Sequence, residues 1–73
     1  MNFGEAINAM KDGKRVQRAG WNGKGMWIAA QYPDENSLMD GGPYVYISDP
    51  NGKRFPWNAS QQDLFADDWK ILE

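Results

Sequence analysis

Apolar residues near the start of the chain recur with the spacing of one helix face. Four of them stand at positions i, i+3, i+4 and i+7, namely Phe3, Ala6, Ile7 and Met10. This spacing predicts a short amphipathic helix with its apolar stripe against the core. Asn2 and Glu5 have the spacing of a capping box at its start, and Gly13 favours its end.

After this helix the pattern changes to the alternation typical of β-strands. The segments that carry it are residues 14–18, 25–31, 44–48, 53–57 and 68–72. The sequence Asp49-Pro50-Asn51-Gly52 predicts a tight turn with positive φ at the glycine. Pro56 restricts its strand to a sheet edge or a bulge because proline has no N–H to donate. Ser60 and Asp63 form a second capping box, which predicts a helical turn through Ala66.

This order of elements predicts a single domain over residues 1–73, of the α+β class. One N-terminal helix packs on a strongly bent antiparallel β-sheet of about five strands, with a short helical turn before the last strand.

Segment 25–31 has apolar side chains on both faces, with Ile28 on one side and Trp27 on the other. One short helix covers only one face of a sheet, so the second face needs another cover. The pattern therefore predicts a homo-oligomer.

At 73 residues the chain has a thin core, and it has neither cysteine nor histidine. Disulfides, thiolate metal sites and the commonest general base are therefore excluded. Large aromatic side chains help to fill a small core, and Phe3, Phe65 and Trp69 are expected there.

The net charge of −2 and the scattered lysines and arginines argue against DNA or RNA as a partner. No apolar run is long enough to span a membrane, and no signal peptide is recognisable, so we expect an intracellular protein.

Four candidate motifs do not match their consensus patterns. Gly20, Gly23 and Gly25 have neither the dinucleotide-binding spacing nor that of a P-loop. The acidic loop after Pro33 lacks the glycine and ligands of a calcium site. Asp67 and Asp68 point apart in an extended chain, which disfavours a catalytic carboxylate pair.

Two tryptophans beside turns are each followed by an asparagine, Trp21-Asn22 and Trp57-Asn58. A flat ring next to an amide can stack on a base and bind its edge. Arg18 or Lys24 could meet a phosphate. The alternative for both tryptophans is structural, as lids over a thin core.

Two long segments, FGEAINAMKDGKRVQRAGWNGKGMW and FPWNASQQDLFADDWKIL, resemble the second family of phage Thoeris anti-defence proteins. The resemblance covers nearly the whole chain. It implies a homotetrameric sponge, free of cofactors, in the cytoplasm of the infected bacterium. Such a sponge holds cyclic nucleotide signals, notably glycocyclic ADP-ribose isomers and in some members cyclic dinucleotides, without degrading them.

The resemblance also implies a ligand wall, formed by Trp21, Asn22, Trp57, Asn58, Ser60, Gln61 and Asp63. For Ser60 and Asp63 the primary role expected is helix capping. The loop 32–43 and the Asp49 turn are compact, which leaves open which signal fits.

A second hypothesis is an interaction module that binds a protein through exposed aromatic residues. An enzyme ranks third, because without histidine and cysteine it would depend on carboxylates, and none are spaced persuasively.

Overall fold

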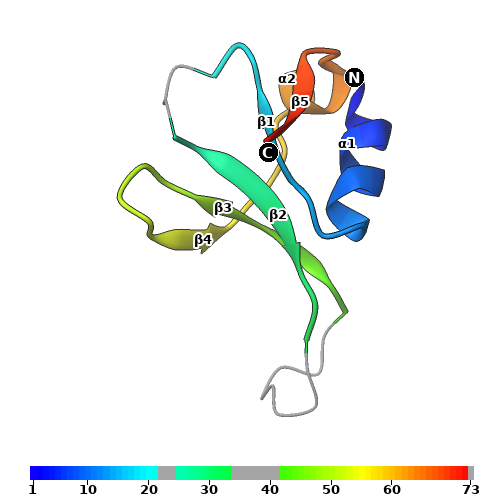
Figure 1. Cartoon of the computed structure of the whole chain (residues 1–73). Helices are drawn as coiled ribbons and strands as arrows, with labels where there is room; N and C mark the ends of the chain where they lie inside the picture. The colour runs from blue at the N-terminus through cyan, green and yellow to red at the C-terminus, as the bar shows by residue number, and fades with distance from the viewer. Residues whose placement is uncertain (22–24, 34–41, 73) are drawn as a thin grey trace.

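A computed structural model describes residues 1–21, 25–33 and 42–72. Within them, one N-terminal helix packs on a five-stranded antiparallel sheet, and a short second helix precedes the last strand (Figure 1). This arrangement confirms the predicted α+β class. The elements are α1 (Phe3–Lys11), β1 (Arg15–Arg18), β2 (Trp27–Gln31), β3 (Tyr44–Ser48), β4 (Arg54–Pro56), α2 (Gln61–Phe65) and β5 (Trp69–Leu72).

Both ends of α1 form as the sequence predicts. The Asn2 side chain accepts a hydrogen bond from the Glu5 N–H at 2.8 Å, and the Glu5 carboxylate accepts one from the Asn2 N–H at 3.0 Å. Gly13 follows the helix with a φ of 86°, a conformation that only glycine adopts without strain. The helix is thereby fixed in length, and it turns Ala6, Ala9 and Met10 into the core.

The strands are ordered β4-β3-β2-β1-β5, and every neighbouring pair is antiparallel. Strands β1 to β4 follow one another along the chain, whereas β5 returns to the far side of β1 (Figure 1). Strand β4 with Pro56 lies at one edge, as the missing proline N–H requires. The first and last strands of the sequence therefore lie side by side.

The turn between β3 and β4 is held by its aspartate. The Asp49 carboxylate accepts hydrogen bonds from the N–H groups of Asn51 and Lys53 at 2.9 and 2.8 Å. Gly52 has a φ of 84°, so the predicted turn and the role of its glycine are confirmed.

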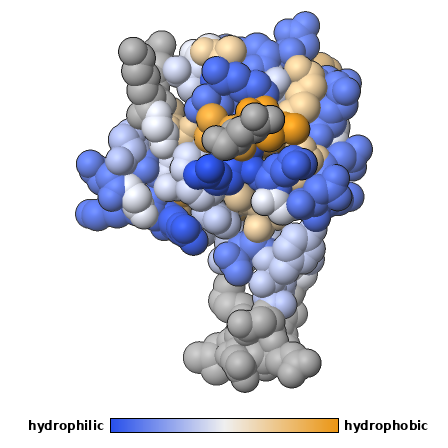
Figure 2. Space-filling model, viewed as in Figure 1, coloured by the Kyte–Doolittle hydropathy of each residue, from blue (hydrophilic) through white to orange (hydrophobic). Residues whose placement is uncertain are grey.

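The core lies between α1 and one face of the sheet. Val16 and Ile28 are register partners on β1 and β2, and both are fully buried. The most buried members of the core are Ala6, Met10, Val16, Ile28 and Trp69. The face seen in Figure 2 is mainly hydrophilic, with the most hydrophobic atoms near its centre and paler orange areas at the top and upper right.

One expected core residue lies outside. Phe65, at the end of α2, is 85% exposed. The buried position of this short helix belongs to Asp63 instead, because that side chain caps the helix and binds Arg18. The sequence-based assignment of Phe65 to the core is therefore wrong, whereas Phe3 and Trp69 pack as expected.

Candidate functional site

Four aromatic side chains gather at the end of the core near α2. This aromatic cluster consists of Phe3, Trp21, Trp57 and Trp69. Trp69 is its buried member, whereas Trp21 and Trp57 are only partly buried. The Trp21 ring lies edge-on to the rings of Trp69 and Trp57, at centroid distances of 5.3 and 6.2 Å. The two tryptophans predicted to hold a ligand thus form one continuous aromatic rim on the core.

The position of Trp21 combines the two roles considered for it. Its contact with Trp69 is that of a side chain that helps to close the core. Its remaining exposed surface keeps part of the indole open to solvent. Stacking of a ligand on that surface stays a prediction.

Trp57 is placed by the strand next to it. Its backbone N–H donates to the Val45 carbonyl at 3.0 Å, which extends the pairing of β3 and β4 by one residue. Its ring lies 6.1 Å from that of Trp69, nearly perpendicular at 85°. The sheet, rather than a loose loop, therefore carries this ring.

Arg18 lies between two carboxylates. Its Nη1 is 2.9 Å from Oδ1 of Asp63, and its Nε is 2.9 Å from Oδ1 of Asp68. The hydrogen bonds that it donates to Asp68 and then to Asp63 raise the pKa of its guanidinium. One positive charge is thus surrounded by two negative ones, so the group has little capacity left for a phosphate. This geometry does not favour the phosphate contact considered for Arg18.

Ser60 and Asp63 form the predicted capping box of α2. The Ser60 hydroxyl accepts from the Asp63 N–H at 3.1 Å, and Oδ2 of Asp63 accepts from the Ser60 N–H at 3.0 Å. Burial raises the pKa of Asp63, but the hydrogen bonds from the Ser60 backbone, Arg18 and the Ser60 hydroxyl outweigh it. The pKa of Asp63 is therefore lowered, and both of its oxygens are engaged within the chain.

The other predicted wall residues stand apart from this network. Asn58 and Gln61 are exposed, one directly after Trp57 and one in the first turn of α2. Asn22 and Lys24 lie outside the described residues. The structure therefore brings together Arg18, Trp21, Trp57, Ser60 and Asp63, and leaves Asn58 and Gln61 on the surface beside them.

Asp68 is a site residue that sequence reasoning missed. Its carboxylate binds Arg18 through Oδ1 and the Gly20 N–H through Oδ2, the latter at 3.0 Å. The hydrogen bond from Arg18 is the main cause that lowers the pKa of Asp68. Only the pairing of β1 with β5 brings these residues together, and no local spacing in the sequence reveals it.

A second aromatic group lies on the opposite face of the sheet. Arg15 lies over the ring of Trp27 at 5.2 Å, and Arg54 lies over Trp27 and Tyr46 at 5.9 and 5.1 Å. Trp27 and Tyr46 meet edge to face at 5.8 Å. We call these four residues the arginine–aromatic face. It supplies part of the cover that the second face of β2 was expected to need.

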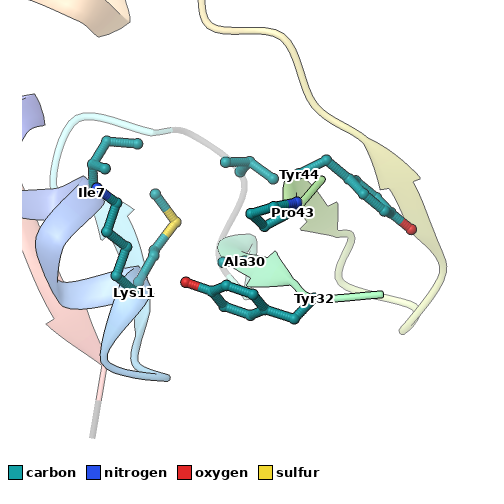
Figure 3. Close-up of a pocket in the computed structure, with 8 residues that line it drawn as sticks. Ile7, Lys11, Ala30, Tyr32, Pro43 and Tyr44 are labelled. Carbon is teal, nitrogen blue, oxygen red and sulfur yellow. The ribbon is translucent and has the colours of Figure 1, made fainter. Parts of the chain in front are cut away.

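A cavity of about 190 Å³ opens between α1 and the ends of β2 and β3 (Figure 3). Its walls are mostly apolar, with Lys11 and the Tyr32 hydroxyl as polar groups, while the Tyr44 ring turns away from Ile7 and Lys11. It is smaller than the usual site for a drug-sized ligand. None of its lining residues belongs to the aromatic cluster, so it is a separate feature.

Among the described residues, no helix is long and apolar enough to cross a membrane. In the same part of the chain, no group of three acidic side chains converges as a metal site would require.

Known proteins resemble the chain both in a family model and in sequence. The model of the Thoeris anti-defense 2-like domain matches residues 1–72. The chain is also similar to a protein of Bacillus phage SP01 named Thoeris anti-defense 2, with 33% identity over 84 aligned positions that cover 99% of this chain and 94% of the relative. Because the alignment is longer than the 73 residues of the chain, the relative carries insertions.

Proposed function

Because the chain belongs to the Thoeris anti-defence 2-like family, which supports a phage anti-defence role, we propose that it binds and sequesters a cyclic nucleotide immune signal. In this proposal the ligand is a glycocyclic ADP-ribose isomer or a cyclic dinucleotide. The protein holds the signal intact, away from its effector, in the cytoplasm of the infected cell.

The observation that carries this proposal is the aromatic rim. Trp21 and Trp57 stand partly exposed on the fixed ring of Trp69, which donates its indole N–H to the Asp63 carbonyl at 3.1 Å. A base stacks on such a surface with a gain of about 1–3 kcal/mol per aromatic ring. Asn22 and Asn58 follow the two tryptophans in the sequence, and we propose that their amides form hydrogen bonds to the edge of a base or ribose. Gln61 is proposed as a further ligand contact beside the rim.

Sequestration fits the chemistry of these side chains better than catalysis does. The carboxylates nearest the rim, Asp63 and Asp68, have lowered pKa values and remain ionised at neutral pH. Such groups are poor general acids or bases there, since an effective catalytic pKa lies near the working pH. The proposed site therefore binds without turnover, which is what a sponge requires.

The Asp63–Arg18–Asp68 group has one positive and two negative charges, so it repels phosphate rather than attracting it. In this proposal the phosphates are met by Lys24 or by a neighbouring subunit, and the protein acts as a homo-oligomer, a tetramer by family resemblance.

The test is to incubate the purified protein with glycocyclic ADP-ribose, remove unbound nucleotide and denature the protein by heat. Mass spectrometry of the released material should show the intact nucleotide. A cleaved product would point to an enzyme. Recovery of none would contradict the proposed ligand.

The second candidate function is a protein-interaction module. It is favoured by the 85% exposed Phe65 and by the arginine–aromatic face, because arginine, tryptophan and tyrosine are enriched at interface hot spots. Substitution of Trp27 and Trp21 separates the two candidates, since the former belongs to that face and the latter to the rim.

A further inference from the structure

The turn that carries Trp21 is attached to the segment before β5 through one residue. The Ala19 N–H donates to the Asp68 carbonyl at 2.9 Å, and the Gly20 N–H donates to the Asp68 carboxylate at 3.0 Å. The Trp21 N–H donates in turn to the Arg18 carbonyl at 3.2 Å. Asp68 therefore binds the backbone on the approach to Trp21 with both its main chain and its side chain.

Arg18 completes this attachment from the other side. Its guanidinium binds the second oxygen of Asp68 through Nε and reaches α2 through Asp63. A planar guanidinium that donates in two directions fixes both partners, because its N–H groups have a rigid geometry. The Arg18 side chain thus joins the end of β1 to α2 and to the residue before β5.

The Trp69 ring that Trp21 contacts is held by residues adjacent to this network. Trp69 follows Asp68 directly, and its indole N–H is bound by the Asp63 carbonyl. The backbone before Trp21 is therefore bound by Asp68, and the Trp69 ring that Trp21 contacts is bound by the backbone of Asp63, whose side chain binds Arg18.

We propose that Arg18 and Asp68 are positioning residues that set the orientation of the Trp21 ring for its ligand, without contacting the ligand themselves. This inference rests on the proposed function. Fixing a binding ring before the ligand arrives raises affinity because less order has to be created on binding.

The affinities of single and double variants distinguish a direct contact between Arg18 and the ligand from an indirect effect of the Arg18–Asp68 pair. If Arg18 bound a phosphate, Arg18→Gln would weaken binding, whereas Asp68→Asn would leave it unchanged or strengthen it. If the two residues act as a pair, each single substitution weakens binding, and the double substitution weakens it by less than the two single effects combined.

The experiment measures glycocyclic ADP-ribose affinity by calorimetry for wild type, Arg18→Gln, Asp68→Asn and the double variant. It is done well below the melting temperature of the least stable variant. We expect each single substitution to weaken binding about tenfold, and the double to weaken it clearly less than the roughly hundredfold loss of two independent effects. Asp67→Asn and Lys14→Gln are the controls, because each removes one charge from an exposed side chain outside the Arg18–Asp68 pair.

Near-ultraviolet circular dichroism gives a second readout. In the folded protein its signal depends on how the tryptophan rings are oriented, and not on the free energy of unfolding. Trp21→Phe identifies the band that belongs to this ring, and Arg18→Gln and Asp68→Asn should both change that band at a temperature where the protein is folded. If wild type binds no nucleotide, the proposed function fails, and the band alone decides whether the pair positions Trp21. Unchanged binding and an unchanged band in Asp68→Asn would overturn the inference, as would a strictly additive double variant.

Discussion

Trp21 lies edge-on to Trp69, with ring centroids 5.3 Å apart and an angle of 80° between the rings. Trp21 is partly exposed, whereas Trp69 is only 2% exposed. A side chain in this position contributes to the core and also offers a surface, so its two contributions have to be measured separately.

Trp21→Ala should weaken glycocyclic ADP-ribose binding about ten- to a hundredfold, because one stacking ring is lost. It should also lower stability by about 1–3 kcal/mol, since two edge-to-face contacts disappear. Calorimetry on the folded protein and urea denaturation measure the two effects. Trp27→Ala is the matched control and should leave binding unchanged, because Trp27 lies on the opposite face. Full affinity in folded Trp21→Ala would assign Trp21 to the core alone.

Acid should weaken the fold through the two carboxylates that bind Arg18. A carboxyl with a lowered pKa in the folded state stabilises the protein above its unfolded pKa, near 3.8, and this contribution disappears as the pH falls through the folded pKa. Asp68→Asn should therefore lower the urea midpoint at pH 6, and the difference from wild type should shrink as the pH falls below 3.8. A difference independent of pH would show that the charge of Asp68 does not matter.

Ile28→Ala should lower the free energy of unfolding by about 2–5 kcal/mol, because the side chain is fully buried beneath α1. Ile71→Ala is the control. It removes the same atoms on the same side of the sheet from a side chain that is 39% exposed, and it should cost clearly less. Urea denaturation of both variants tests this, and equal losses would contradict the position of the core.

Phe65→Ser should destabilise the fold of each chain little, because 85% of the residue is exposed and its ring makes few contacts within the chain. If the chain forms the proposed oligomer and Phe65 lies at a subunit contact, the same variant should have a smaller mass in light scattering. A wild-type protein that is monomeric at micromolar concentration would rule out the oligomer, whereas an unchanged oligomer in Phe65→Ser would place its contacts elsewhere.

Local patterns predicted the elements well. The capping boxes at Asn2 and Ser60 and the turn at Asp49 formed as expected, because each is specified by residues within four positions of one another. The strands were predicted within about two residues at each end. Features of this kind depend on the backbone nearby and need no knowledge of the tertiary fold.

The site was harder to predict because it depends on partners far apart in the chain. The charge of Arg18 suggested a phosphate contact, whereas the pairing of β1 with β5 supplies it with two carboxylates. Phe65 was assigned to the core by its type, although the helical geometry of α2 gives the buried position to Asp63. The arginines over Trp27 were missed for the same reason, since Arg54 comes from a strand that meets β2 only through β3.

The pairing of the first strand with the last also determines the order in which the chain can fold. Arg18 and Asp68 are 50 positions apart, and the Met1 amino group bonds to the Trp69 carbonyl across 68 positions. The contacts within β2 to β4 span far fewer positions and can form earlier, because contacts of long range in the sequence are slow to form. Because Trp69 is the largest buried side chain, the core stays open until residues 69–72 have been synthesised and have docked beside β1. Substitutions in β5 can be compared with equally destabilising ones in the β3–β4 hairpin. If β5 docks in the transition state, its substitutions should slow refolding more than those in the hairpin. If β5 docks after the transition state, its substitutions should mainly speed unfolding.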